Sequence, residues 1–147
     1  MNKRNLYFRM AGIIVLVFIF SSVDTQTSLR YKTLCKTWMY ESIEAKIGFP
    51  MDTTIIYFSR SWKTDTTGIS KARRTFHPNG DYSSVSKEGK PSAGNSKWEL
   101  SDNESSITIY NNKGKKEKYV ILRLRPDYLE LSIKKRGIKT VLKMIPE

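Results

Sequence analysis

The chain contains very little of the two side chains that most often carry metal or nucleophile chemistry. Among 147 residues there is one cysteine, Cys35, and one histidine, His77. A structural zinc site uses about four Cys or His ligands, and a disulfide needs a second thiol. Cys35 and His77 fall in separate predicted elements, so the sequence indicates no paired thiol and imidazole. We therefore expect no metal site and no disulfide within the chain.

Other signatures of catalysis or cofactor binding are also missing. The eight glycines stand singly along the chain, most of them at predicted turns, so no glycine-rich loop is available to cradle a phosphate. The acidic residues are scattered over separate strands and turns, and no motif brings two of them together as a glycoside hydrolase requires. We therefore expect a non-catalytic protein without a cofactor.

The most apolar segment of the chain lies at its beginning. Lys3, Arg4 and Arg9 precede an uninterrupted apolar run over Met10–Phe20, and small or polar residues follow it. This is the order of a secretory signal. As a helix the run would span roughly 16 Å, at about 1.5 Å per residue, against about 30 Å for a bilayer core. Residues 1–26 are therefore predicted to be a signal peptide or an uncleaved signal anchor.

Export would place residues 27–147 in the periplasm, elsewhere in the cell envelope or outside the cell, and a retained signal would hold them at the membrane. The whole chain carries a formal charge of +12. The first 26 residues hold three cations and one anion, so the remaining domain keeps a net charge of +10. Because that domain has a single thiol, it must fold by burying an apolar core without internal disulfides.

Beyond the signal-like segment, apolar residues recur with a period of two, which is typical of β-strands that bury one face. The clearest unit is a hairpin over Arg73–Val85, in which Asn79 and Gly80 supply the positive φ of a tight turn. Tyr128–Lys134 is the most regular half-buried strand. Further strands are predicted over Trp38–Ile43, Thr53–Arg60, Ser96–Leu100, Ser106–Tyr110, Lys118–Arg125 and Ile138–Met144.

The alternation also predicts which side chains face inward. In Tyr128–Lys134, we expect Leu129, Leu131 and Ile133 to be buried. In Lys118–Arg125, the pattern puts Val120, Leu122 and Leu124 on one face and Tyr119 and Ile121 on the other, and we expect Leu122 inside. Lys46–Asp52 and Ser61–Ser70 are predicted connections, and Lys87–Ser96 is predicted to be the most flexible loop.

About eight or nine short strands with no helix long enough for a parallel crossover require a sheet that closes on itself or pairs with another. Most of the links are tight hairpins, which join sequence neighbours directly. The predicted fold is therefore all-β: a small antiparallel up-and-down β-barrel preceded by an N-terminal signal helix.

Five segments resemble, in order, the lipocalin-like domains of exported bacterial proteins. They are Leu34–Trp38, Thr75–Tyr82, Gly94–Leu100, Tyr119–Leu124 and Leu129–Leu131, and the resemblance covers roughly residues 34–145. Those domains share a start of the form L-x-G-x-W, a hairpin T-F-x-x-(D/N)-G-x-Y and a strand G-x-W-x-L. Lys36 stands where the family usually has glycine. The resemblance implies a calyx-like β-barrel.

A closed barrel of about eight strands has an interior that is filled by its own side chains or is wide enough for one small ligand. The sequence leaves both outcomes open. Aromatic side chains can present an apolar face together with a polar group to a ligand. A small apolar or amphipathic ligand is the leading functional expectation, and it could be anionic. The predicted ligand-binding residues are Trp38, Tyr40, Phe76, Tyr82, Trp98 and Tyr110.

Positive charge gathers near the C-terminus. We call five of these positively charged residues the basic patch: Lys115, Lys116, Lys134, Lys135 and Arg136. The alternative function is an interaction module whose basic patch docks on a partner protein or an anionic envelope surface. Nucleic acid is not the expected partner, because an exported protein rarely meets it and the aromatic residues alternate into the core instead of lying among the cations. A solvated outer face that discourages edge pairing is the simplest interpretation of the charges.

Overall fold

The computed structural model describes residues 28–47, 53–61, 65–92 and 96–147. The predicted signal segment, residues 1–26, lies outside these ranges. Within the described ranges, no helix is long and apolar enough to cross a membrane.

Two short helical segments and nine strands make up the described chain. The helical segments are α2 (Leu29–Leu34) and the 3-10 turn η1 (Ile69–Lys71). The strands are β1 (Thr37–Ile47), β2 (Thr53–Ser59), β3 (Arg73–Phe76), β4 (Asp81–Val85), β5 (Ser96–Leu100), β6 (Ser106–Tyr110), β7 (Lys116–Arg125), β8 (Tyr128–Lys135) and β9 (Ile138–Pro146). The predicted strands are all present, and β1 continues past the expected end at Ile43 to Ile47.

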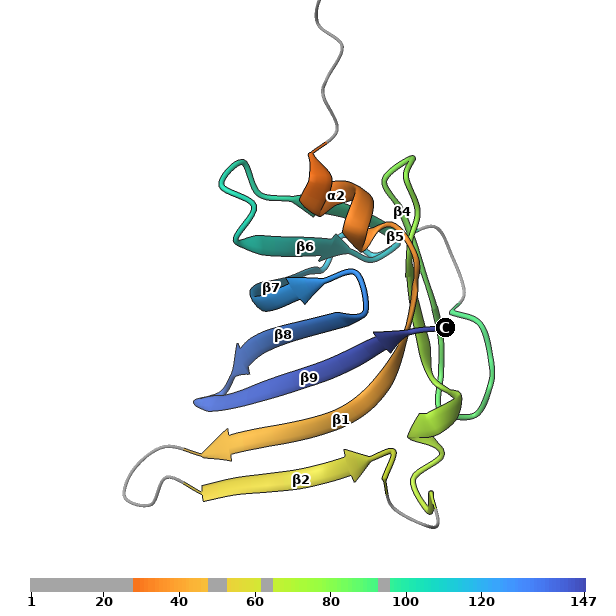
Figure 1. Ribbon diagram of the computed structural model, residues 1–147, viewed down its shortest axis with the longest axis vertical. Helices are drawn as coiled ribbons and strands as arrows, with labels where there is room; N and C mark the ends of the chain where they lie inside the picture. The colour runs from red at the N-terminus through yellow and green to blue at the C-terminus, as the bar shows by residue number, and fades with distance from the viewer. Residues whose placement is uncertain (1–27, 48–52, 62–64, 93–95) are drawn as a thin grey trace, which may run out of the picture.

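The strands form one antiparallel sheet that closes into an eight-stranded barrel, which confirms the predicted fold class (Figure 1). Closure is made by β1 and β9, which pair from Trp38 and Pro146 at one end to Ile47 and Ile138 at the other. Each strand from β3 to β8 pairs with the next one in sequence. The hairpin order expected from the tight turns is therefore the order in the barrel.

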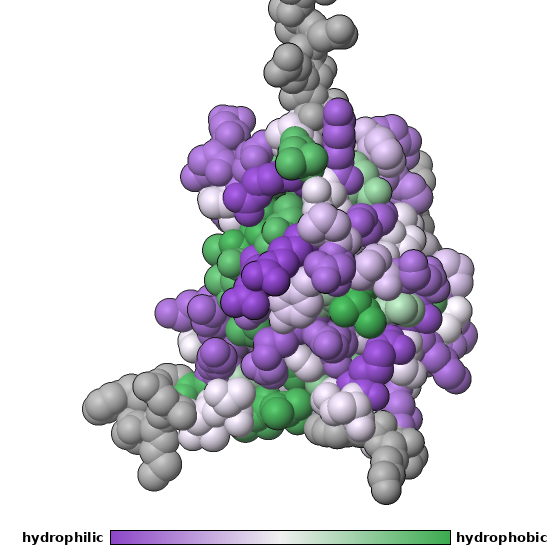
Figure 2. All heavy atoms as spheres, in the orientation of Figure 1, coloured by the Kyte–Doolittle hydropathy of each residue, from purple (hydrophilic) through white to green (hydrophobic). Residues whose placement is uncertain are grey.

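The ninth strand, β2, lies outside the closed ring. β1 pairs with β3 only over Thr37–Met39 and with β2 over Ser42–Ile47. Irregularities in the register of β1 between Tyr40 and Ser42 accompany this change of partner. Ile56 and Tyr57 of β2 are each 50% exposed, and Figure 2 shows an apolar area over β2 on a face that is otherwise mostly polar.

One end of the barrel, called the closed end below, is covered by α2 (Figure 1). Ser28 caps this helix, because its Oγ accepts a hydrogen bond of 3.0 Å from the Tyr31 backbone N–H. Tyr31 stacks on Trp98 with 4.7 Å between ring centroids. The Trp38 indole Nε1 donates to the Leu34 carbonyl at 3.0 Å. Lys36, at the position where the resembled family has glycine, donates to the Pro126 carbonyl at 2.8 Å.

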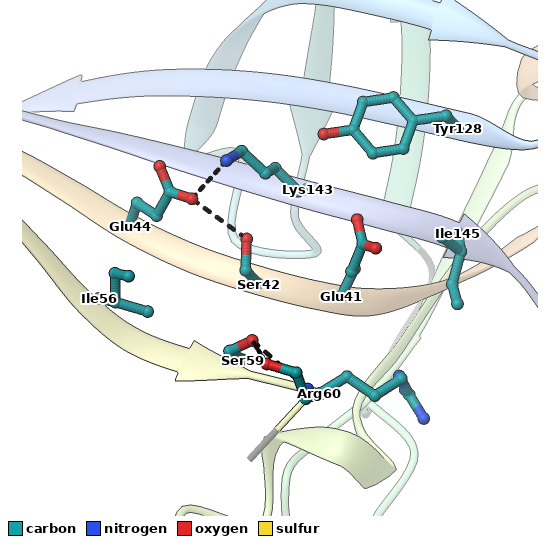
Figure 3. Close-up of a pocket in the computed structure, with 10 residues that line it drawn as sticks. Glu41, Ser42, Glu44, Ile56, Ser59, Arg60, Tyr128, Lys143 and Ile145 are labelled. Atoms are coloured by element: carbon teal, nitrogen blue, oxygen red, sulfur yellow. Dashed lines mark hydrogen bonds and ion pairs between the residues drawn. The ribbon is translucent and has the colours of Figure 1, made fainter.

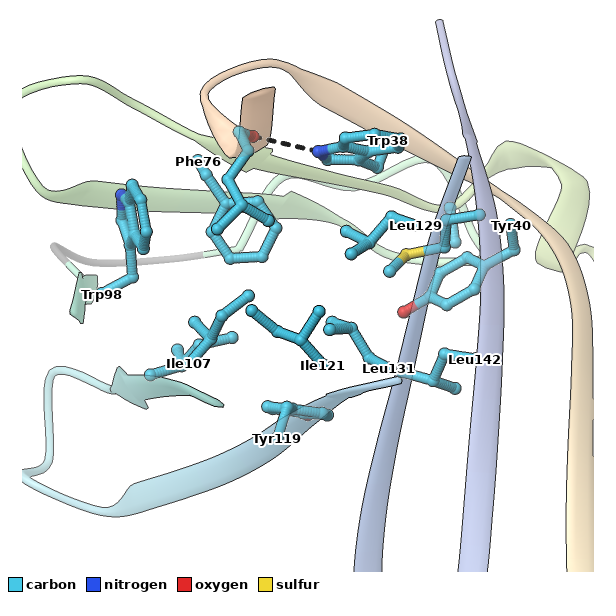
Figure 4. Close-up of a cluster of buried hydrophobic side chains, with 14 of the residues drawn as sticks. Trp38, Tyr40, Phe76, Trp98, Ile107, Tyr119, Ile121, Leu129, Leu131 and Leu142 are labelled. Carbon is cyan, nitrogen blue, oxygen red and sulfur yellow. Dashed lines mark hydrogen bonds between the residues drawn. The ribbon is translucent and has the colours of Figure 1, made fainter. Parts of the chain in front are cut away.

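Large apolar side chains fill the barrel behind α2 (Figure 4). Trp38 and Leu131 are completely buried, and Phe76 contacts Trp98 edge-on with 5.2 Å between ring centroids. Leu129 and Leu131 are buried and Ile133 packs against the core, as the alternation of β8 predicts. This part of the interior is packed with the chain's own side chains.

The inward face predicted for β7 is wrong over the first half of the strand. Tyr119 and Ile121 are buried there, whereas Val120 and Leu122 are 46% and 43% exposed. The pairing with β8 shifts register between Ile121 and Arg123, so the strand contains a bulge at this point. A single extra residue reverses which alternate side chains face inward. Leu124, beyond the bulge, therefore packs against the core.

A matched pair of leucine substitutions tests this arrangement. Leu131→Ala should lower the free energy of unfolding by about 2–5 kcal/mol, because it leaves a cavity in the core. Leu122→Ala should change it by less than about 1 kcal/mol, because the side chain is already exposed. Urea denaturation followed by tryptophan fluorescence measures both. Equal losses in the two variants would contradict the position of the bulge.

Candidate functional site

A cavity of about 320 Å³ opens into the barrel at the end opposite α2, called the open end below. It lies between strands β3 to β7, where the hairpin that joins β6 to β7 turns. Its lining is mostly polar, and Ile109 is its one aliphatic residue. The lining residues are Arg74, Tyr82, Ser84, Ser92, Ser96, Ile109, Asn111, Asn112, Lys115, Glu117 and Tyr119.

The strand register explains why an arginine faces this cavity. Arg74 of β3 pairs with Trp38 of β1 and with Ser84 of β4. Cross-strand partners point to the same side of a sheet, and Trp38 is completely buried in the barrel. Two residues further along β3, Phe76 is also buried. Arg74 is therefore an inward-facing residue of the barrel, at the boundary between the apolar core and the cavity.

Tyrosine side chains surround the Arg74 guanidinium. Its Nε donates to the Tyr40 hydroxyl, and its central carbon lies 5.6 Å from the centroid of the Tyr40 ring and 5.0 Å from that of Tyr119. Within the described ranges, no carboxylate oxygen lies within 4.0 Å of this guanidinium. Burial opposes the charged form, but the oxygens of Tyr40, Tyr82 and Tyr119 raise the pKa of Arg74 above its ordinary value. The side chain stays charged at every physiological pH.

Two of the phenols around Arg74, those of Tyr82 and Tyr119, stay protonated at neutral pH. Burial raises the pKa of Tyr82 to about 12, although the Arg74 charge acts in the opposite direction. Burial also raises the pKa of Tyr119. Both hydroxyl groups are therefore neutral and can donate hydrogen bonds.

The one carboxylate among the cavity residues is already paired. Glu117 accepts a hydrogen bond from the Tyr119 hydroxyl at 2.8 Å and forms an ion pair with Lys135 at 2.6 Å. The Lys135 hydrogen bond lowers the pKa of Glu117 from its ordinary value. Because Lys135 neutralises Glu117, Arg74 and Lys115 leave the cavity with an excess of positive charge.

The structure places the six predicted ligand-binding residues in three different environments. Trp38, Tyr40, Phe76 and Trp98 lie in the core, and of these Tyr40 reaches Arg74 (Figure 4). Tyr82 lines the cavity. Tyr110 lies outside the barrel, where its hydroxyl donates to Glu99 at 2.6 Å and Lys116 sits 5.2 Å from its ring centroid. Tyr110 alternates along β6 with the buried Ile109 and therefore faces away from the interior.

Arg74, Glu117 and Tyr119 belong to the cavity but were absent from the predicted set. Arg74 has a signal in the sequence: it is two residues before Phe76 on the same strand, so it shares the inward face. Glu117 and Tyr119 alternate in the same way with the buried Ile121. Their inward direction depends on the bulge in β7, which the alternation of residues does not reveal.

The basic patch does not form a single surface. Lys115 lines the cavity, and Lys116 lies over the ring of Tyr110 on the outer face. Lys135 is paired with Glu117. Lys134 and Arg136 are exposed, near the turn between β8 and β9. The patch therefore borders the open end of the barrel and contributes one member to the cavity.

A second and larger hollow, of about 610 Å³, lies on the outer face of β1, β2, β8 and β9 (Figure 3). Its central charges are matched. Lys143 forms an ion pair with Glu44, whose carboxylate also accepts a hydrogen bond of 3.4 Å from the Ser42 hydroxyl. The Glu44 hydrogen bond raises the pKa of Lys143. The cavity at the open end differs because its most enclosed charge, Arg74, has no such carboxylate.

The fold and the cavity together define a closed antiparallel β-barrel with a polar, positively charged hollow at one end. No protein-family model and no curated protein matches the chain. Two solved structures are similar to it. A lipocalin-like protein from Bacteroides uniformis is 14% identical with a TM-score of 0.46, over 76% of this chain and 97% of that one. A de novo designed fluorescence-activating β-barrel is 11% identical with a TM-score of 0.41, over 79% and 95%.

The raised pKa of Tyr82 predicts a loss of stability in alkali. The unfolded chain ionises this phenol near its ordinary pKa of 10.0, whereas the folded chain holds it neutral up to about pH 12. Its contribution is therefore complete below about pH 10 and is lost as the pH rises toward 12. Allowing for solvent screening, Tyr82→Phe should remove about 1–2 kcal/mol of this alkaline loss.

Urea denaturation at about pH 9, 10, 11 and 12 measures the effect. Tyr57→Phe is the control, because Tyr57 is 50% exposed on β2, outside the barrel. The Tyr82→Phe protein should show a flatter dependence on pH than the wild type and the control. Three parallel curves would show that Tyr82 is not held neutral by the fold.

Proposed function

We propose that the protein is an exported, non-catalytic binding protein of the cell envelope, similar to lipocalin-like proteins, which holds one small amphipathic molecule at the open end of its barrel. The observation that carries this proposal is the cavity of about 320 Å³ inside the closed barrel. Small-molecule sites are commonly concave pockets of about 300–1,000 Å³ with a few convergent polar groups. The cavity is at the lower end of that range, which suits a small ligand.

The lining of the cavity favours an amphipathic ligand over a wholly apolar one. The apolar interior behind α2 is occupied by the chain's own side chains, so a hydrocarbon ligand has no room there. Ile109 and the rings of Tyr82 and Tyr119 offer apolar contact within the cavity, while serine and asparagine side chains offer hydrogen bonds. A ligand with a short apolar part and a polar group would use both.

The placement of Cys35 and His77 supports a role without catalysis. Burial raises the pKa of the Cys35 thiol, which disfavours the reactive thiolate. The His77 Nε2 atom is 3.0 Å from the Ser83 hydroxyl, in the turn between β3 and β4 near α2. Both residues therefore lie toward the closed end, away from the cavity.

Ligand binding accounts for the structure better than docking of the basic patch. Docking on an anionic surface would require the five cations to face one partner together. Lys115 instead lines the cavity, and Lys135 is neutralised by Glu117. The patch then serves the cavity entrance, where its field would attract an anionic ligand.

Native mass spectrometry of protein purified from its own cells tests the proposal. We expect a bound small molecule in the wild type and its loss in Ser84→Trp, because Ser84 lines the cavity and an indole there would fill the space. Ser83→Trp is the matched control, since the neighbouring Ser83 is exposed. A wild-type protein without any ligand, or a Ser84→Trp variant that keeps it, would contradict the proposal.

Export is tested separately by cell fractionation and intact mass. A cleaved signal predicts a mature chain that lacks about the first 26 residues and is found outside the cytosol. A full-length chain in the membrane fraction would identify the signal anchor. A full-length chain in the cytosol would contradict export without affecting the cavity.

A further inference from the structure

We propose that the molecule held in the cavity carries an anionic group, a carboxylate, phosphate or sulfate, which binds to the Arg74 guanidinium. This inference rests on the proposed function, because it assigns the chemistry of the ligand in the same cavity. The shared feature of the three groups is an oxyanion with at least a pair of oxygens that can accept from one guanidinium.

The Arg74 guanidinium has N–H donors that its protein partners do not use. A guanidinium presents a planar fork of N–H groups and no acceptor. The Tyr40 hydroxyl accepts from Nε, and Tyr119 provides a second polar contact. These phenols engage only part of the fork, and the guanidinium borders the cavity. An oxyanion in the cavity could accept from the remaining N–H groups.

Arg74 also carries an enclosed positive charge that no carboxylate of the described residues compensates by direct contact. A charge removed from water is destabilising unless an opposite charge or strong hydrogen bonds compensate it. The rings of Tyr40 and Tyr119 give Arg74 cation–π contacts, which offset part of that cost. The Arg74 charge contributes to lowering the pKa of Glu117, but that carboxylate is paired with Lys135 and does not contact the guanidinium directly. A bound anion would supply the direct anionic partner that Arg74 lacks among the described residues.

A comparison with other cations of the same barrel supports this interpretation. Lys143 on the outer face pairs with Glu44, Arg73 beside Arg74 in sequence pairs with Glu147 at 2.9 Å, and Lys135 pairs with Glu117. In the described part of the chain, these cations at or near the surface have carboxylate partners and the inward-facing Arg74 has none. The difference singles out Arg74 as the site where a carboxylate or its equivalent would come from a ligand.

The groups around Arg74 also suit an anion. Tyr82 keeps its hydroxyl proton and can donate, and Ser84, Ser92 and Ser96 line the same cavity. Lys115 adds a second positive charge at the entrance. Glu117 would repel an anion, but Lys135 and the Tyr119 hydroxyl already hold its two oxygens. The arrangement therefore attracts an anion more strongly than a neutral or cationic group.

The geometry fits planar and tetrahedral oxyanions alike, because a guanidinium fork can bind either through paired hydrogen bonds. We therefore suggest four probes of one ring size: benzoate, phenyl phosphate, phenyl sulfate and the neutral benzyl alcohol. Binding to ligand-free protein is measured by isothermal titration calorimetry at constant ionic strength. At least one anionic probe should bind at least 10-fold more tightly than benzyl alcohol. A tenfold difference in affinity corresponds to about 1.4 kcal/mol, which calorimetry measures readily. The strongest anion identifies the group.

Substitutions locate the binding to Arg74. Arg74→Met keeps much of the side-chain length. It should lower the affinity for the anionic probe by 10-fold or more and change the affinity for benzyl alcohol by no more than about 2-fold. Arg123→Met is the matched control: Arg123 also lies over a tyrosine ring, 5.9 Å from the Tyr128 centroid, but is exposed on the outer face. It should bind every probe as the wild type does. If Arg74→Met does not fold, Arg74→Lys keeps the charge without the fork and should show a smaller loss.

The outcomes separate this inference from the proposed function. Equal affinity for benzyl alcohol and the anions, or an Arg74 variant that folds and binds the anions unchanged, would overturn the anionic assignment while leaving a ligand-binding barrel. If no probe binds and the protein from its own cells contains no ligand, the proposed function fails as well.

Discussion

The pairing of β1 with β9 is the constraint on which the rest of the structure depends. Strands β3 to β9 follow one another in sequence, whereas β1 must meet β3 beyond the excursion of β2 and must meet β9 over the longest sequence distance in the barrel. That contact removes both free edges of the eight-stranded ring and creates an inside. Without it, Trp38 and Arg74 would lie on one face of an open sheet, in contact with water.

Closure also makes the two ends of the barrel different. At the closed end, α2 contributes Leu34 and Tyr31, and the Trp38 and Trp98 indoles find acceptors in the backbone carbonyls of Leu34 and His77. At the open end, Ile69 of η1 packs against the core but does not line the cavity, and the inward positions around the cavity change from apolar to polar. The apolar half stabilises the fold, which leaves the polar half available for binding. The cavity is thus the part of the interior that the core does not occupy.

Much of this arrangement could be predicted from the sequence, and the failures have local causes. Alternation in β8 and the Asn79–Gly80 turn indicated the strands, and the hairpin links indicated the barrel. The bulge in β7 could not be foreseen from the sequence. Val120, Leu122 and Leu124 form one regular apolar face, and Tyr119 and Ile121 form an equally regular face on the other side, so either face could have been the buried one. Aromatic type was a poor guide to the cavity, since most of the predicted aromatic residues fill the core. The alternation of side chains along β3, which puts Arg74 on the same inward face as Phe76, was the better guide to the cavity.

Arg74 affects both the stability of the barrel and its proposed ligand binding. The guanidinium lies where Tyr40 from β1, Tyr82 from β4 and Tyr119 from β7 converge, so its environment exists only after the barrel has closed. An apolar residue at this position would extend the core and avoid the cost of an enclosed charge. A charge retained among tyrosine side chains, beside a cavity whose single carboxylate is already paired, would instead be preorganised for the anion that we propose. The barrel thus gives up some stability at this position, and a bound anion would restore it.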